Sequence, residues 1–105
     1  MALWRARMLH HFVLLRLKAD ITPQQTDAFI NEAREVLGPI QGVQNLRVGF
    51  GLGVKSERSY PIALIMDFED EAALEAYQVH PEHQRFVKEI VGPIQDDKQV
   101  YDYLC

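Results

Sequence analysis

The first patterned segment of the chain alternates its side chains between two faces. Residues 9–18, LHHFVLLRLK, are rich in apolar residues and end in charge, which is typical of a buried strand. One face carries His11, Val13, Leu15 and Leu17, and the other carries His10, Phe12, Leu14 and Arg16. Because both faces are largely apolar, we expect each of them to be covered.

A helical period follows over residues 23–37. Thr22 is the expected N-cap, Pro23 takes the first helical position, and Gln25 completes a capping box. The apolar residues expected on one side of this helix are Ala28, Phe29, Ala33, Val36 and Leu37. Gly38 and Pro39 should end the helix.

Two strands are predicted next. Residues 42–53, GVQNLRVGFGLG, have Val43, Leu46 and Val48 at their apolar positions, and the closing glycines predict a bend or bulge at the end of the strand. The polar run VKSERS, residues 54–59, predicts a loop. Residues 60–69, YPIALIMDFE, are the clearest strand. Ile62, Leu64 and Met66 lie on one face, and Ala63 and Ile65 lie on the other.

The C-terminal third predicts two helices and a strand. Residues 70–80, DEAALEAYQVH, form a short helix that begins at an acidic cap, and Pro81 interrupts it. Residues 81–91 form a further helix, which ends at Gly92 and Pro93. In the last strand, residues 98–105, the two faces carry Val100, Asp102 and Leu104 on one side and Tyr101 and Tyr103 on the other.

The element order is therefore β-α-β-β-α-β, which predicts an α+β, ferredoxin-like fold with a four-stranded antiparallel sheet. A chain of 105 residues is expected to form one domain, residues 1–105. In this fold the helices cover one face of the sheet. The open face would carry apolar side chains from every strand, a surface that a monomer does not leave in water. We therefore expect a homodimer formed through the open sheet faces.

The net charge, the opening residues and the cysteine content argue against several classes of protein. The net charge of −4, with no basic stripe, argues against nucleic-acid binding and against attraction to anionic membranes. The opening MALWRARML contains two arginines, and LLRLK interrupts the apolar run behind it, so we expect this run to be too short and too charged for a signal peptide or a membrane span. Cys105 is the one cysteine, so no intramolecular disulfide is possible. We expect a cytoplasmic protein.

The segment Tyr77-x-x-His80-Pro81-x-His83 carries the candidate chemistry. His83 can accept a proton from an acidic carbon beside a carbonyl, and the Tyr77 hydroxyl can donate a hydrogen bond to the developing enolate oxygen. The structural alternative is that His80 caps a helix, His83 ties that helix to the sheet, and Tyr77 packs in the core. A metal site at His80 and His83 is disfavoured because no cysteine or further cluster accompanies them.

Five stretches of the chain are informative when they are taken together: HHFVLLRLKADIT, GPIQGV, YPIALIMDF, LEAYQVHPEH and the terminal VYDY. In this order, and covering nearly the whole chain, they resemble the Dabb family, the stress-responsive dimeric α/β-barrel proteins. The resemblance implies the ferredoxin-like fold and a barrel-forming homodimer. It also implies that a weak site for a hard cation, built from backbone carbonyls, can exist in the loop Gly38–Val43.

The resemblance extends to a plant polyketide cyclase of the family that uses no metal or organic cofactor. It implies that Tyr77 and His83 are the catalytic residues, and that no cofactor is needed. His11, His80, Asp102, Leu64 and Met66 match positions at that cyclase's site. Ala33 and Lys98, however, replace an aromatic residue and a leucine of its pocket wall. The ligand pocket expected here is lined by His11, Val13, Leu15, Phe29, Leu64, Met66, Leu74, His80, Phe86, Val100 and Asp102.

Three functions remain open from the sequence. The first is a homodimer that binds a small hydrophobic ligand in a cavity between sheet and helices. The second is a cofactor-independent enzyme that acts on a carbonyl compound through His83 and Tyr77. The third is a cofactorless monooxygenase like those of the wider dimeric α/β-barrel superfamily.

Overall fold

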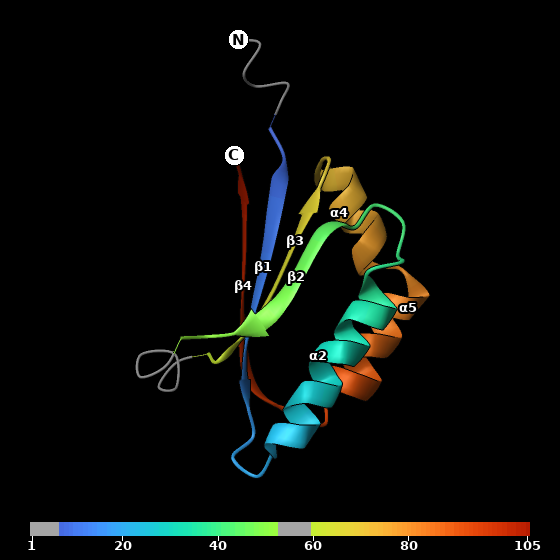
Figure 1. Cartoon of the computed structure of the whole chain (residues 1–105). Coiled ribbons are helices and arrows are strands. Elements are labelled where there is room, and N and C mark those ends of the chain that lie inside the picture. The colour runs from blue at the N-terminus through green and yellow to red at the C-terminus, as the bar shows by residue number, and fades with distance from the viewer. Residues whose placement is uncertain (1–6, 53–59) are drawn as a thin grey trace.

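The computed structural model describes residues 7–52 and 60–105, and its elements follow the predicted order (Figure 1). The elements are β1 (Leu9–Leu17), α2 (Pro23–Leu37), β2 (Gln44–Phe50), β3 (Ile62–Phe68), α4 (Glu71–Gln78), α5 (Pro81–Arg85), the π-helix η1 (Phe86–Val91) and β4 (Gln95–Leu104). Residues 1–6, Gly53 and the loop predicted over 54–59 lie outside the described residues.

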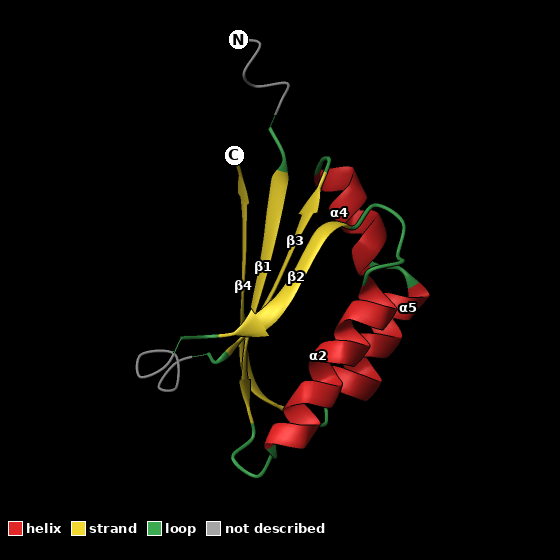
Figure 2. Ribbon diagram, viewed as in Figure 1, coloured by secondary structure: helices red, strands yellow, loops and turns green. Residues whose placement is uncertain are grey.

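The four strands form one antiparallel sheet in the order β2-β3-β1-β4. The helices lie together on one face of this sheet, and the other face carries no helix (Figure 2). The strands β1 and β3 are central, so β2 and β4 are the two edges. The predicted α+β, ferredoxin-like fold is confirmed.

The hydrophobic core lies between the sheet and the helices. Of the two faces that the sequence assigns to β1 and β3, the one that carries Leu15, Leu64 and Met66 is turned towards the helices, and these side chains are almost fully buried. In α2 the buried stripe differs from the prediction: Thr26 and Ile30 are buried, whereas Ala28 is exposed. The stripe follows spacings of three and four residues from position 26, which brings Ile30 rather than Ala28 over the sheet.

The helix caps follow the sequence closely. The backbone N–H of Gln25 donates to the Thr22 hydroxyl over 3.1 Å, and the Thr22 N–H donates to the Gln25 side chain over 2.8 Å. Asp70 caps α4 by accepting from the N–H of Ala73. These bonds satisfy backbone donors that the first turn of a helix leaves without partners.

The helix predicted over residues 81–91 differs in its second half. It begins at Pro81 as expected, but from Phe86 to Val91 it is a π-helix. The N–H of Gly92 donates to the carbonyl of Val87, five residues earlier, which is the hydrogen bond of that wider turn. A Cβ atom at Gly92 would lie only 2.9 Å from the carbonyl oxygen of Lys88, so the close turn requires glycine here.

The irregularity predicted for the end of the second strand lies at its start instead. The register of β2 against β3 shifts between Gln44 and Arg47, and Asn45 has a φ of 51°. Gly49 pairs regularly with Ala63. Asparagine tolerates the left-handed conformation better than most residues, which explains why the bulge forms at Asn45.

The edge strand β4 extends beyond the helices. It begins at Gln95, three residues before the predicted start, and its side chains lie on the predicted faces. Val100 and Leu104, on the helix side of the sheet, are 48% and 50% exposed. Tyr101, on the other face, is 68% exposed. The helices therefore leave the apolar side chains of β4 uncovered on both faces.

An apolar band crosses the face of the sheet that carries no helix. The band consists of Phe12, Leu14, Ala63, Ile65, Tyr101 and Tyr103. The Tyr103 ring lies 5.6 Å from Phe12 and 6.2 Å from Tyr101 between centroids. The expectation that every strand contributes an apolar side chain is wrong for β2, which places Arg47 and Gly49 on this face.

Candidate functional site

A histidine and an aspartate meet where β1 and β4 run side by side. His11 and Asp102 are directly opposite each other in the register, and the His11 Nδ1–H donates to the Asp102 carboxylate. His11 is 4% exposed, whereas the side chain of Asp102 is 35% exposed. A one-residue slip of β4 would move Asp102 to the opposite face, so the strand register itself builds this pair.

Tyr77 packs against this pair from α4. It lies three residues after Leu74 on the buried side of the helix and is 2% exposed. Its ring lies 6.1 Å from the His11 ring and 5.1 Å from the Phe68 ring between centroids. Burial raises the pKa of the Tyr77 hydroxyl well above its usual value of 10.0. Tyr77 therefore stays protonated at neutral pH and can act as a hydrogen-bond donor.

His83 reaches the same cluster from α5. Its ring lies 4.3 Å from the Tyr77 ring between centroids. The carbonyl of Gln78 can only accept, so the His83 Nδ1 carries the hydrogen of the 3.1 Å bond between them. In the neutral ring the free lone pair is therefore on Nε2.

The surroundings keep His83 neutral. Burial is the main cause that lowers its pKa, and the charges of His11, Lys98 and His80 lower it further. The hydrogen bond to Gln78 acts in the opposite direction with a smaller effect. A neutral histidine with a free Nε2 has the form that a general base requires.

His80 has a structural contact. Its Nδ1 accepts the backbone N–H of Glu82 over 3.1 Å, which makes it the N-cap of α5. The motif thus combines a helix cap at its middle histidine with two ring neighbours, Tyr77 and His83, that lie beside the His11–Asp102 pair.

A cleft of about 490 Å³ opens beside the cluster, between α4 and β4. It is lined by Leu9, Glu71, Leu74, Glu75, Gln78, Asp102, Tyr103 and Leu104. The cleft thus borders the cluster through Asp102 and Gln78, whereas Tyr77 and His83 are not among the lining residues.

Most of the pocket residues suggested by the sequence lie in the hydrophobic core. Leu15, Phe29, Leu64, Met66, Leu74 and Phe86 belong to the buried cluster, with Val13 partly buried against it. Val100 is exposed on β4. Of the whole predicted set, the cleft is lined by Leu74 and Asp102.

Three cleft residues were missed from α4: Glu71, Glu75 and Gln78. They are spaced four and three residues apart and therefore lie on one face of the helix beside Leu74. The helical period contained this signal, but an exposed glutamate normally indicates nothing more than a solvated surface.

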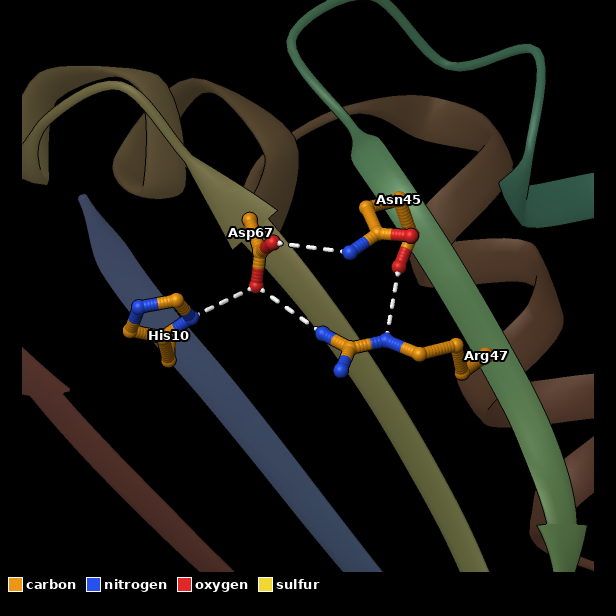
Figure 3. A network of polar contacts seen from close by, with 4 residues as sticks. All are labelled: His10, Asn45, Arg47 and Asp67. Carbon is orange, nitrogen blue, oxygen red and sulfur yellow. Dashed lines mark hydrogen bonds and ion pairs between the residues drawn. The ribbon is translucent and has the colours of Figure 1, made fainter.

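A second His–Asp pair lies on the open face of the sheet (Figure 3). The His10 Nδ1–H donates to Asp67 over 2.7 Å, Arg47 donates to the same carboxylate over 3.1 Å, and Asn45 donates over 3.2 Å. Asp67 is 8% exposed. The His10 ring is stacked on Tyr103 at 5.0 Å. Asp67 is thus surrounded by donors from both neighbouring strands.

No group of three or more His, Cys, Asp or Glu side chains within residues 7–52 and 60–105 is arranged to hold a metal ion. A cation site of the kind expected at Gly38–Val43 would use backbone carbonyls instead, and it stays a prediction. Among the described residues, no helix is long and apolar enough to cross a membrane.

Comparison with known proteins decides the family. The family model of the stress-responsive A/B barrel domain, Dabb, matches residues 9–105. The chain belongs to the Dabb family. A curated relative from Arabidopsis thaliana, a stress-response A/B barrel domain-containing protein, is 27% identical over 101 residues. The alignment covers 96% of this chain but 38% of the relative, so the chain spans well under half the length of that protein.

Two solved structures share the architecture of this chain. A dimeric ferredoxin-like protein of unknown function from Thermobifida fusca is 25% identical with a TM-score of 0.81, and 94% of this chain and 92% of that chain are covered. The hydroxynitrile lyase from Passiflora edulis is 21% identical with a TM-score of 0.80, and 93% of each chain is covered. At that identity, the likeness to the lyase shows the fold alone.

Proposed function

We propose that this Dabb protein is a homodimer that binds a small, largely apolar molecule in the cleft between α4 and β4. The observation that carries the proposal is the make-up of the cleft, which is lined by the apolar residues Leu9, Leu74 and Leu104 together with Asp102. Ligand sites typically combine apolar walls with a few placed polar groups. Asp102 is held in position by His11, so its exposed oxygen can accept a hydrogen bond from a ligand.

The apolar band on the open face supports the dimer. An exposed strip of aromatic and aliphatic side chains on three strands is characteristic of a protein interface. Polar groups lie at both ends of the band: the Asp67 network at one end, and Arg16, which donates to Asp96 and Asp97, at the other. The similar T. fusca protein is dimeric, which agrees with this arrangement. Two copies packed through these faces would cover Phe12 and the tyrosines.

Native mass spectrometry of the freshly purified chain tests this function. We expect the mass of two chains, with a reproducible small adduct when the cleft retains its ligand. Blocking the cleft should remove the adduct without removing the dimer, and Leu104→Trp is suited to this because Leu104 lines the cleft and is 50% exposed. A monomeric mass at micromolar concentration, or an adduct that survives Leu104→Trp, would contradict the proposal.

A second candidate function is proton transfer on a carbonyl compound. The observation that favours it is the free Nε2 of a neutral His83 beside the protonated hydroxyl of Tyr77. In the proposed step, Nε2 takes a proton from the carbon next to a carbonyl. The electrons of that C–H bond form a C=C bond, and the carbonyl oxygen becomes an enolate that accepts a hydrogen bond from Tyr77. Return of the proton restores neutral His83.

This candidate ranks second because neither Tyr77 nor His83 lines the cleft. The lyase from P. edulis shares the fold, so the fold is compatible with an enzyme. No feature of residues 7–52 and 60–105 favours the oxygen-using hypothesis over these two.

Cys105 is exposed and is the only cysteine, which fits a reducing compartment such as the cytoplasm.

Hydrogen–deuterium exchange into a simple ketone tests the enzyme function. In deuterated buffer, an active site of this kind should exchange the α-protons of 4-phenyl-2-butanone faster than buffer does. His83→Ala should remove the acceleration, and Tyr77→Phe should reduce it, while both variants stay folded. Exchange at the buffer rate with the wild-type chain would rule out this chemistry for that class of ketone.

A further inference from the structure

The polar part of the cleft lining is acidic. Glu71 and Glu75 on α4 and Asp102 on β4 contribute three carboxylates. The lining contains no lysine, arginine or histidine among the described residues. Within the same part of the chain, neither glutamate forms an ion pair with another side chain. The cleft therefore presents two carboxylates, those of Glu71 and Glu75, that no ion pair among the described residues balances.

The carboxylates lie on both walls of the cleft. Glu71 and Glu75 are one helical turn apart, so their side chains extend from the same face of α4. Asp102 comes from the opposite wall, where its charge is shared with the His11 ring. A ligand between the walls would meet negative charge from two directions, and apolar contact from Leu9, Leu74 and Leu104.

We propose that the cleft selects a ligand with an apolar body and a single positive charge, such as a protonated aryl-alkyl amine. This inference rests on the proposed binding function and specifies its ligand class. An ammonium group placed between the walls gains attraction from the glutamates, whereas a carboxylate of the same size is repelled.

Three probes of nearly equal size isolate the charge: 2-phenylethylamine is a cation at pH 7, 2-phenylethanol is neutral, and phenylacetate is an anion. Isothermal titration calorimetry with the dimeric chain at low salt gives the affinity for each probe. We expect the amine to bind about tenfold more tightly than the alcohol, and phenylacetate to bind most weakly. The preference should shrink as salt is added, because ions screen exposed charges.

The double variant Glu71→Gln/Glu75→Gln identifies the source of the preference. It should bind the amine and the alcohol with nearly equal affinity, because the attraction that favours the amine is removed. The matched control is Glu32→Gln/Glu35→Gln, which removes the same charge from exposed positions on α2 that do not line this cleft. The control should keep the wild-type preference, which separates local charge from the net charge of the chain.

The outcomes distinguish this inference from the function on which it rests. If the alcohol binds but the amine binds no more tightly, the ligand class is wrong and the binding function stands. If the control variant loses the preference as fully as the cleft variant does, the local origin of the preference is wrong. If none of the three probes binds, the cleft is not a site for such molecules, and both proposals are overturned.

Discussion

His10 and His11 are neighbours in the chain, and each forms a hydrogen bond to an aspartate on an adjacent strand, yet they lie on opposite faces of the sheet. On the open face, the His10 partner Asp67 also receives hydrogen bonds from Arg47 and Asn45. On the helix face, Asp102 accepts a hydrogen bond from His11 and lines the cleft.

The two His–Asp pairs differ in the charged residues around the aspartate and in how exposed the aspartate is. Arg47 balances the charge of Asp67 within the protomer, so that pair is complete and suits a surface that a second copy covers. Among the described residues, Asp102 has no arginine or lysine partner, and its side chain is 35% exposed. That aspartate can meet a ligand. Substitutions on the face without helices, where Asp67 lies, should therefore act differently from substitutions on the helix face, where Asp102 lies.

The largest effect is expected from a charge on the helix face. Leu64 is 3% exposed within the core, so Leu64→Asp would bury a carboxylate without a partner. We expect a loss of more than about 4 kcal/mol, which abolishes folding of a domain of this size. Circular dichroism during thermal unfolding measures this. A cooperative transition near the wild-type temperature would show that Leu64 is not a core residue.

The same charge on the open face should separate the protomers but leave them folded. Phe12 lies in the apolar band and is only partly buried in one chain. We expect Phe12→Asp to weaken the dimer roughly a hundredfold or more, because the carboxylate would be desolvated in the interface. Analytical ultracentrifugation gives the mass and circular dichroism the fold.

The control for this variant is Val79→Asp. Val79 is 67% exposed at the end of α4, away from the open face, and its substitution should leave the dimer unchanged. A folded Phe12→Asp dimer as tight as the wild type would place the interface elsewhere.

Removing the charge of Asp67 and removing that of Asp102 should lower the free energy of unfolding by different amounts. Asp67→Asn weakens three hydrogen bonds at a buried position, and we expect it to cost about 1–3 kcal/mol. Asp102→Asn weakens one bond at a more exposed position and should cost about 1 kcal/mol or less. Urea unfolding at one fixed protomer concentration compares them. Equal losses would remove the distinction between the two faces.

The smallest expected effect is a pH dependence at His83. Its pKa in the folded chain is lowered below the usual 6.5, so the unfolded chain binds the proton more tightly. The stability from neutral His83 is complete above pH 6.5 and declines as the pH falls through the folded-state pKa. His83→Gln should flatten this acid-side decline. Urea midpoints at a series of pH values below 7 measure it, and a decline as steep as that of the wild type would contradict the assignment.

The sequence predicted the alternation of β1, β3 and β4 and the helix caps because these depend on local periods and on residues such as Thr22, Pro23 and Asp70. The same alternation predicted that the side chains of His10 and His11 lie on opposite faces of β1. The contact of each histidine with its aspartate depends on strand register, which no single segment contains. The sequence also did not predict the π-helix at Phe86–Val91, because the apolar period of this segment is that of an ordinary helix.

The candidate site was predicted in part. Tyr77, His83, His11 and Asp102 were all selected beforehand, and the structure brings them together. Most of the expected pocket residues lie in the core and do not line this cleft, because apolar residues at helix and strand periods pack there first. The cleft walls include Glu71 and Glu75, which the sequence did not indicate because they line the cleft only where α4 lies beside β4.

The proposed ligand site, the cleft between α4 and β4, can be located by heteronuclear NMR. The ¹⁵N-labelled protein is titrated with 2-phenylethanol, because binding of this neutral probe does not depend on charge. We expect the largest chemical-shift changes at the backbone amides of Leu9, Leu74, Gln78 and Leu104. Changes centred on Phe12 and Ile65 instead, or spread evenly over the chain, would contradict this location of the site.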